Sequence, residues 1–162
     1  MNITAKSRYA LKIMMDLALN VDMGQQQRHN IANRQHIPVD FMDQITSCLR
    51  NSGLIQSVRG RSGGFLLSKK PSEITLYDIF TSVEDNFYPL KCVDNEPCEL
   101  DQSCISMKVW KDLYNEIRNL LMSKTLSDIC KDRILPPLSE IATGHHSCNK
   151  PRIQCGINLA ET

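Results

Sequence analysis

Residues 31–70 read IANRQHIPVDFMDQITSCLRNSGLIQSVRGRSGGFLLSKK, and this stretch decides the fold. Ile31 and Ala32 begin a short helical pattern, which Pro38 interrupts because proline lacks a backbone donor. Apolar residues at positions 41, 45 and 49 then mark a second helix that ends near residues 51–53. Two short helices joined by a tight turn form a helix-turn-helix.

The next residues predict a β-hairpin. Two short apolar strands, within LIQSV and FLLSK, flank the sequence RGRSGG at residues 59–64. Glycines supply the positive φ angles that a hairpin tip needs, and Arg59 and Arg61 add two guanidinium groups at this tip. A hairpin directly after a helix-turn-helix is a wing.

Two further helices complete the first domain. The apolar positions 11, 14, 15 and 18 predict a helix from about Ser7 to Asn20. Thr75 and Asp78 are spaced like a capping box, and the apolar positions 76, 79, 80 and 83 predict a helix that closes the domain. We therefore expect a mainly α-helical fold with a winged helix-turn-helix over residues 1–84.

The second half of the chain predicts a long helix after an irregular segment. Residues 85–104 have no regular period, and such a stretch inside a compact protein usually has a function. The helix, from Ser103 to Ser123, carries an apolar stripe that a small monomer covers poorly, so we interpret it as a homodimer interface; packing within one subunit is the alternative. The stripe consists of Trp110, Leu113, Ile117, Leu120 and Leu121.

A last capped helix is expected from Thr125 to about Arg133. We accordingly divide the remainder of the chain into a cysteine-bearing loop at 85–104, the dimerisation helix and following helix at 105–134, and a flexible tail at 135–162.

The charge is distributed unevenly. Residues 1–70 contain 10 Lys and Arg against 4 Asp and Glu, whereas the remainder contains 9 against 14. A basic half joined to an acidic half favours a nucleic-acid surface on the first domain, although a solvated basic surface gives the same count. No stretch has the roughly 18 consecutive apolar residues of a membrane span, and the first residues mix charges into the apolar pattern, unlike a signal peptide. We expect a cytoplasmic protein with no membrane partner.

Seven cysteines are many for a cytosolic chain of this size, and an odd number argues against a complete disulfide framework. Metal or redox chemistry is the working interpretation. Cys48 and Cys130 lie inside helical patterns and are better explained as buried apolar residues. We find no phosphate-binding glycine motif and no nucleophile–base pattern, so we do not expect an enzyme.

Several segments, taken in order, resemble the Rrf2 superfamily of bacterial winged-helix regulators over roughly residues 1–134. They are ITAKSRYAL, IANRQHIPVDFMDQI, LRNSGLIQSVRGRSGGFLLSK, ITLYDIF, and three cysteines followed by a W-x-D-L element that begins at Trp110. The resemblance is closest to the iron–sulfur assembly regulators of that family. It implies a dimer that binds double-stranded promoter DNA.

The resemblance also implies a [2Fe-2S] or [4Fe-4S] cluster on Cys92, Cys98 and Cys104, because the iron–sulfur regulators share this C-x5-C-x5-C spacing. Met107 stands where those relatives have a histidine ligand, and Arg8 stands where the nitric-oxide sensors of the family have an aspartate ligand. Neither side chain suits iron. The fourth ligand is therefore open, with solvent and the following residues as candidates: Glu99, Asp101, His145, His146, Cys148 and Cys155.

The second helix of the helix-turn-helix is the expected recognition helix. It should begin at Pro38, bury Phe41 or Met42 together with Ile45, and present polar side chains to the major groove. Asp43 and Gln44 suit base readout, because a carboxylate accepts from cytosine and an amide pairs with adenine. The expected base-reading residues are Val39, Asp40, Asp43 and Gln44, and Pro38 at the start of the helix is also expected in the DNA interface.

Cationic side chains complete the expected DNA interface. Arg59 matches the wing arginine of the family and suits a narrow minor groove, with Arg61 beside it. Phosphate contacts are expected from Lys6, Arg8, Arg50, Lys69 and Lys70.

We therefore expect a transcriptional regulator that senses iron, iron–sulfur status or redox and nitric-oxide stress through the cluster. Three alternatives to this function stay open. The cysteines would instead bind zinc, form a thiol–disulfide switch or have no ligand role. A cluster-free regulator of the same fold would respond through a protein partner or thiol oxidation. An electron-transfer or metal-storage protein with a vestigial helix-turn-helix is the alternative from another class.

Overall fold

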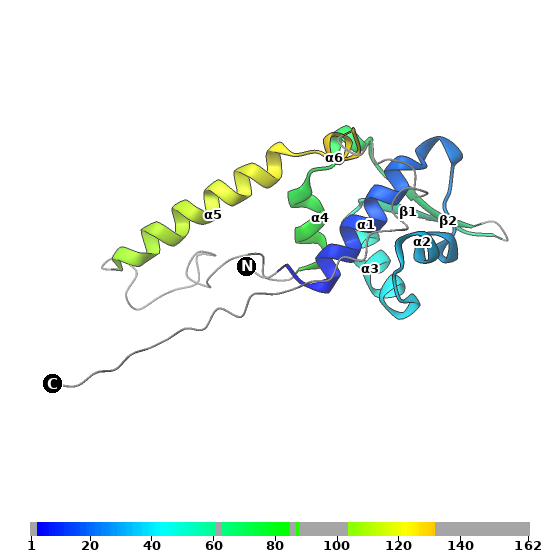
Figure 1. The fold of residues 1–162 in the computed structure, drawn as a ribbon, viewed down its shortest axis with the longest axis horizontal. Coiled ribbons are helices and arrows are strands. Elements are labelled where there is room, and N and C mark those ends of the chain that lie inside the picture. The colour runs from blue at the N-terminus through cyan, green and yellow to red at the C-terminus, as the bar shows by residue number, and fades with distance from the viewer. Residues whose placement is uncertain (1–2, 61–62, 85–86, 88–103, 132–162) are drawn as a thin grey trace, which may run out of the picture.

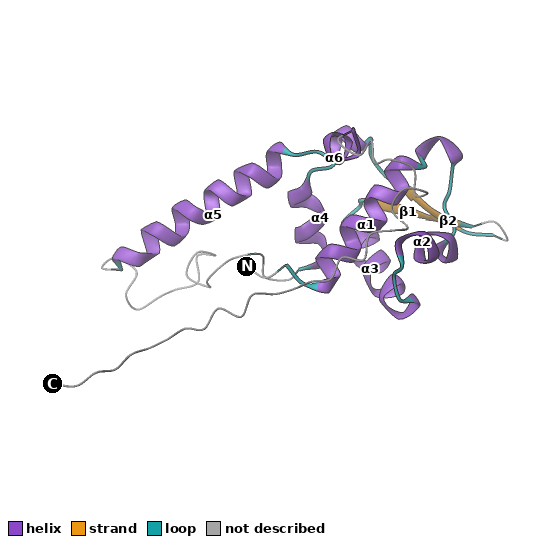
Figure 2. Cartoon of the chain, viewed as in Figure 1, coloured by secondary structure: helices purple, strands orange, loops and turns teal. Residues whose placement is uncertain are grey.

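A computed structural model describes residues 3–60, 63–84, 87 and 104–131. Over these residues the chain is mainly helical, with one two-stranded hairpin (Figures 1 and 2). The expected winged helix-turn-helix is confirmed. The elements are α1 (Ala5–Leu19), η1 (Val21–Met23), α2 (Arg28–Gln35), α3 (Val39–Asn51), β1 (Ile55–Val58), β2 (Gly64–Leu67), η2 (Pro71–Glu73), α4 (Leu76–Val83), α5 (Ile105–Ser123) and α6 (Leu126–Lys131).

Two helices begin earlier than apolar periodicity predicts. The Thr4 hydroxyl caps α1 by accepting from the Lys6 backbone N–H at 3.1 Å, so the helix begins at Ala5 instead of Ser7. The first turn of α2 is polar and exposed, so it contributes nothing to an apolar pattern and the prediction of a start at Ile31 was late. In the second half of the chain, α5 begins at Ile105, which is later than the expected Ser103. Helix α6 is described only as far as Lys131.

The turn between α2 and α3 is tight. His36 adopts a left-handed conformation with φ 52°, which ends α2, and Ile37 then donates its backbone N–H to Ala32 at 3.0 Å. Pro38 is the N-cap residue of α3, immediately before the helix instead of its first residue. The turn therefore connects α2 directly to α3, which is the second helix of the helix-turn-helix.

The core lies among α1, α3, α4 and the hairpin. Ala10, Ile13 and Met14 of α1 are fully buried and meet Met42 and Leu49 of α3 in one cluster. Phe41 is instead 37% exposed and packs its ring edge-on against Tyr9 with 5.5 Å between centroids. Either Phe41 or Met42 was expected to be buried on α3, and the structure buries Met42.

The wing pairs antiparallel, with Ile55 opposite Leu67 and Val58 opposite Gly64. A third segment joins it, because Gln26 and Phe65 exchange two backbone hydrogen bonds of 2.9 Å. A Cβ on Gly64 would lie 2.3 Å from the Gln26 carbonyl oxygen, so only glycine allows this approach. The segment before α2 therefore anchors the wing.

Helix α5 projects away from the winged domain, as Figure 1 shows. Its C-terminal end is attached by a short backbone pairing: Leu76 donates to Lys124 at 2.9 Å, and Leu126 donates to Ile74 at 2.8 Å. Leu126, the first residue of α6, is fully buried in the core of the winged domain. No described helix combines the length and the apolar character required to cross a bilayer.

The apolar stripe expected on α5 divides between two environments. Leu121 packs against the core and Ile117 is half-buried, so part of the stripe is used within the subunit. The other part is exposed, together with two apolar residues that the prediction omitted. The exposed fractions are 63% for Val109, 39% for Trp110, 47% for Leu113, 59% for Leu120 and 44% for Met122.

Candidate nucleic-acid interface and cysteine segment

The N-terminal part of α3 presents the side chains expected to read DNA. Met42 and Ile45 on the opposite side of the helix are buried. The four expected base-reading residues, and Pro38 before them, are exposed: Val39, Asp40, Asp43 and Gln44. The helix therefore has the division between a core side and a solvent side that a recognition helix requires.

Asp43 has a partner that the sequence did not predict. Arg28, at the first residue of α2, donates Nη1 to both Asp43 carboxylate oxygens at 2.5 and 2.7 Å. The two residues are 15 positions apart on different helices, so neither local spacing nor a motif indicated the pair. Both side chains are exposed, at 47% for Arg28 and 65% for Asp43.

The wing places Arg59 directly after β1, where its side chain is exposed. Gly60 follows with φ 125°, which only glycine adopts readily, and a Cβ on Gly63 would lie 2.4 Å from the Val58 carbonyl oxygen. Gly60 thus has the positive φ that was expected of the hairpin glycines, whereas Gly63 is required by its close approach to the backbone of Val58. Arg61 lies outside the described residues.

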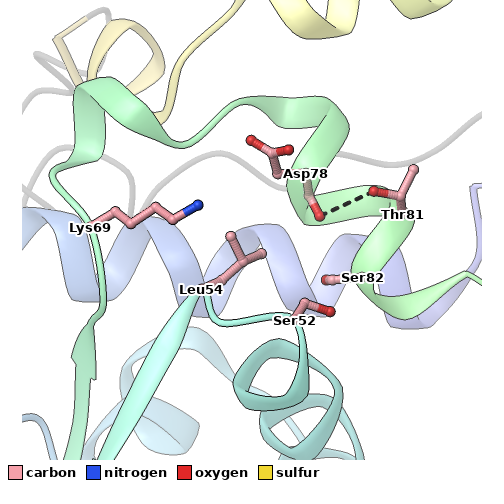
Figure 3. Close-up of a pocket in the computed structure, with 6 residues that line it drawn as sticks. All are labelled: Ser52, Leu54, Lys69, Asp78, Thr81 and Ser82. Carbon is pink, nitrogen blue, oxygen red and sulfur yellow. Dashed lines mark hydrogen bonds between the residues drawn. The ribbon is translucent and has the colours of Figure 1, made fainter.

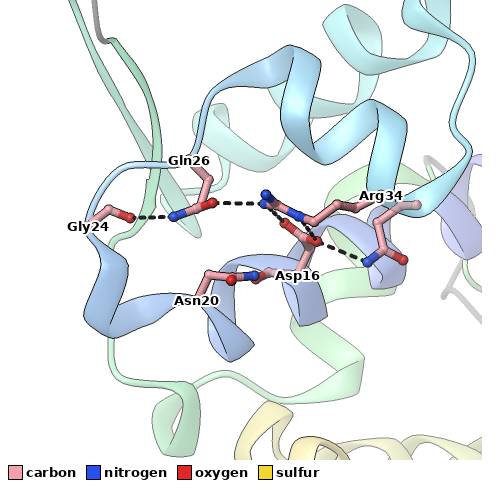
Figure 4. A network of polar contacts seen from close by, with 6 residues as sticks. Asp16, Asn20, Gly24, Gln26 and Arg34 are labelled. Atoms are coloured by element: carbon pink, nitrogen blue, oxygen red, sulfur yellow. Dashed lines mark hydrogen bonds and ion pairs between the residues drawn. The ribbon is translucent and has the colours of Figure 1, made fainter. Parts of the chain in front are cut away.

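An ion pair between a buried carboxylate and a partly exposed guanidinium joins α1, α2 and the segment that anchors the wing (Figure 4). The Asp16 carboxylate, only 2% exposed, accepts from Arg34 at 3.0 and 2.6 Å and from Gln35 at 3.0 Å. Arg34 also donates to the Gln26 side chain at 2.8 Å, and the hydrogen bond with Asp16 raises the pKa of Arg34 against the opposing effect of burial. Sequence reasoning missed this network, because its members looked like ordinary polar positions.

The side chains expected to contact phosphates lie at or near the surface, but they do not all belong to one helix or strand. Arg8, Arg50, Lys69 and Lys70 are exposed and Lys6 is half-buried. Lys69 also borders a small polar hollow of about 210 Å³ beside α4 (Figure 3). The other lining residues of this hollow are Ser52, Leu54, Asp78, Thr81 and Ser82.

Glu84 links the end of α4 to the start of α1. Its carboxylate accepts hydrogen bonds from the hydroxyl groups of Thr4 and Ser7. Burial opposes ionisation of Glu84, but these hydrogen bonds outweigh that effect and hold its pKa below the ordinary 4.5. This contact holds the last residue of the winged domain, directly before the cysteine-bearing loop, against the start of α1.

Of the three predicted cluster ligands, the structure describes Cys104. It is half-buried at the N-cap position of α5, with Sγ 3.2 Å from the Ser106 hydroxyl. Met107 donates its backbone N–H to the Cys104 carbonyl at 3.2 Å, one turn further along the same helix. Cys92 and Cys98 lie outside the described residues, as do the fourth-ligand candidates Glu99, Asp101, His145, His146, Cys148 and Cys155.

The donor set fits an iron–sulfur cluster. Thiolates are the usual ligands of such clusters, and Cys104 lies at the N-cap position of α5. Within the described ranges, no group of three or more metal-binding side chains occurs. Cys48 and Cys130 are half-buried and pack against the core, in keeping with their interpretation as apolar residues.

A profile of the Rrf2 family, described as iron-dependent transcriptional regulators, matches residues 3–132. The chain belongs to the Rrf2 family. Among its relatives is the regulator IscR of Klebsiella pneumoniae, 30% identical over 159 residues that cover 98% of each chain. The named relatives are transcriptional regulators, so the expectation that the chain is not an enzyme is confirmed.

Two solved structures in this Rrf2 group have similar folds. The cysteine regulator CymR of B. subtilis is 31% identical with a TM-score of 0.70, covering 82% of this chain and 98% of CymR. IscR of T. potens is 28% identical with a TM-score of 0.66, covering 89% and 92%. The chain is therefore a transcriptional regulator whose fold resembles both an IscR and a CymR.

Proposed function

We propose that this protein is a cytoplasmic, dimeric regulator that binds promoter DNA and senses iron, iron–sulfur status or redox and nitric-oxide stress through a cluster. The observation that carries DNA binding is the solvent side of α3, which presents polar side chains beside a wing that ends in Arg59. A recognition helix occupies the major groove in such domains, while a wing arginine suits the minor groove.

Cluster binding is supported by the ligand chemistry of this chain. Cys92, Cys98 and Cys104 supply three thiolates within 13 residues, and the similarity to IscR proteins extends along the whole chain. A bound cluster with a weak fourth ligand would supply a group that oxygen, nitric oxide or iron loss can alter. Cys104 at the start of α5 would then transmit cluster loss to the helix expected to set dimer geometry.

Dimerisation is supported by the exposed apolar side chains of α5. Trp110, Leu113 and Leu120 are 39–59% exposed on a helix that projects from the domain. An exposed apolar helix side of this kind is typical of a protein–protein interface. Pairing two winged domains would match two half-sites on DNA.

Anaerobic purification tests the cluster directly. We expect a coloured protein with matched iron and sulfide per subunit, and loss of both in Cys92→Ala. Cys48→Ala is the matched control, because Cys48 packs against the core of the winged domain and should leave the visible spectrum unchanged. Equal operator affinity of the cluster-loaded and cluster-free forms would contradict the proposed coupling.

A cluster-free regulator is the second candidate, favoured by the TM-score of 0.70 to CymR. Colourless, iron-free protein that still binds DNA would support it, and its signal would then be sought in thiol oxidation or a protein partner. Failure to bind any promoter fragment in either state would instead favour a metal or electron-transfer protein.

A further inference from the structure

The exposed side of α3 carries an electrostatic cost for a DNA-binding helix. Asp40 and Asp43 both lie in its N-terminal part, and both are exposed. DNA is a dense polyanion, so each carboxylate brought into the groove is repelled by the phosphates unless a cation compensates it. The ion pair between Arg28 and Asp43 provides such a cation from outside α3.

The geometry leaves Asp43 able to act while it is paired. A single nitrogen, Arg28 Nη1, contacts both carboxylate oxygens at 2.5 and 2.7 Å, so each oxygen keeps acceptor capacity for another donor. Both side chains are substantially exposed, and exposed ion pairs contribute little to folding. The pair is therefore poorly explained as a stabilising feature of the domain.

The position of Arg28 fits a role on the recognition side. It begins α2, the first helix of the helix-turn-helix, and reaches across the turn at His36 to a residue on the second helix. Its guanidinium thus limits the directions in which the Asp43 carboxylate can point. A restrained carboxylate discriminates between bases better than a free one, because it cannot turn toward a donor on another base, and it also loses less side-chain entropy on binding.

We propose that Arg28 is a specificity-determining positioning residue, which restrains Asp43 and compensates its charge while that carboxylate reads a base edge. This proposal rests on the proposed function, in which α3 enters the major groove. Loss of Arg28 should weaken DNA binding and reduce the base preference that Asp43 provides. Neither effect should appear once Asp43 has been removed.

The test is a double-mutant cycle on full-length protein purified anaerobically. A duplex library with a randomised core of about 30 base pairs, enough for two half-sites one helical turn apart, is selected with wild type and sequenced. The enriched duplex and its single-base variants are then titrated at fixed salt with Arg28→Ala, Asp43→Ala and the double variant. Arg28→Lys serves as the charge-conserving variant, and thermal unfolding confirms that every variant is folded.

We expect Arg28→Ala to reduce discrimination at the position read by Asp43 by on the order of threefold, the scale of an exposed ion pair. In the Asp43→Ala background the same change should have no effect on discrimination. Arg50→Ala is the matched control: an expected phosphate contact on α3 should lower affinity for every duplex equally, whether or not Asp43 is present.

Each contrary outcome has a separate meaning. Equal losses from Arg28→Ala in both backgrounds would overturn the inference and make Arg28 a phosphate contact alone. A changed preference in Asp43→Ala but not in Arg28→Ala would overturn the inference and leave the proposed function intact. If Asp43→Ala changes no base preference, then Asp43 does not read a base. If wild type enriches no sequence, DNA binding itself fails. The inference fails in both cases.

Discussion

At the scale of single residues, the exposure of Arg59 depends on Gly60, which follows it directly in the chain. The positive φ of Gly60 turns the chain sharply, which leaves the preceding guanidinium exposed at the end of β1. Glu84 is the contrasting case, since its carboxylate is held by two hydroxyl groups from another helix. One of these residues is expected to act on DNA and the other on the fold.

Arg59→Ala should weaken binding to the selected duplex by at least about 1 kcal/mol, the scale of one lost specific contact. Unfolding by urea should change by less than about 0.5 kcal/mol, because the side chain is exposed. Lys12→Ala removes the same charge from α1, where the ammonium donates to the Gln35 carbonyl, and should leave affinity nearly unchanged. Unaltered affinity of Arg59→Ala at fixed salt would contradict the role of the wing.

Glu84→Gln should lower the free energy of unfolding by about 1 kcal/mol at neutral pH, because hydrogen bonds to a charged, partly exposed acceptor are weakened. Since the folded pKa of Glu84 is depressed, its contribution is present above pH 4.5 and is lost as the pH falls through the folded value. Urea titrations between neutral pH and about pH 3 should therefore give a shallower pH dependence for Glu84→Gln than for wild type. Asp22→Asn, at an exposed carboxyl, is the control, and identical pH profiles for Glu84→Gln and wild type would refute the assignment.

At the scale of elements, the wing and the helix-turn-helix are connected through the segment before α2. Gln26 pairs its backbone with Phe65 of β2 while its side chain accepts from Arg34 of α2. Arg34 in turn binds the buried Asp16 of α1. Direct contacts therefore connect α1 and α2 to the wing.

Arg34→Met should destabilise the protein by about 2–3 kcal/mol, because it leaves the Asp16 carboxylate buried without a counter-ion. Adding Asp16→Asn should restore part of this loss, since a neutral amide costs less to bury. Arg28→Met is a matched control, because it breaks an exposed Arg–Asp pair and should cost less than about 1 kcal/mol in the same urea titration. Equal costs for the two arginine variants would show that burial of Asp16 does not matter.

At the scale of the whole molecule, α5 has two apolar sides with different uses. Tyr114 faces the winged domain, where its hydroxyl lies 3.3 Å from that of Tyr77, and Arg118 covers the Tyr77 ring at 5.4 Å from the centroid. Leu113 and Leu120, two turns apart, remain exposed beside this contact. One side of α5 therefore contacts the winged domain, and the other is the side that we propose for a second subunit.

Leu113→Lys should convert the dimer to a monomer at micromolar concentration, because a charge buried at an apolar interface is strongly unfavourable. Sedimentation velocity of the anaerobically purified protein measures the change. Asn115→Lys, on the opposite side of the same helix, should leave the dimer intact. A dimer that survives Leu113→Lys would place the interface elsewhere.

Features with a local cause were predictable from the sequence. The capping box of α4, formed by Thr75 and Asp78, and the wing glycines Gly60 and Gly63 act within a few residues, so their spacing alone indicates them. The solvent side of α3 was predictable as well, because helical period separates it from Met42 and Ile45. Family resemblance extended these predictions to Cys92, Cys98 and Cys104, whose ligand role stays a prediction.

The sequence by itself determined the order of the α-helices and the hairpin, because helical period, caps and turn residues are short-range properties. Only the tertiary structure decided that Arg28 meets Asp43, that Arg34 meets Asp16, and that Leu126 returns to the core. Contacts between residues far apart in the chain depend on how the helices pack, and a single sequence contains no spacing that specifies the packing. The stripe on α5 was divided for the same reason, since α4 covers one part of it and leaves the other exposed.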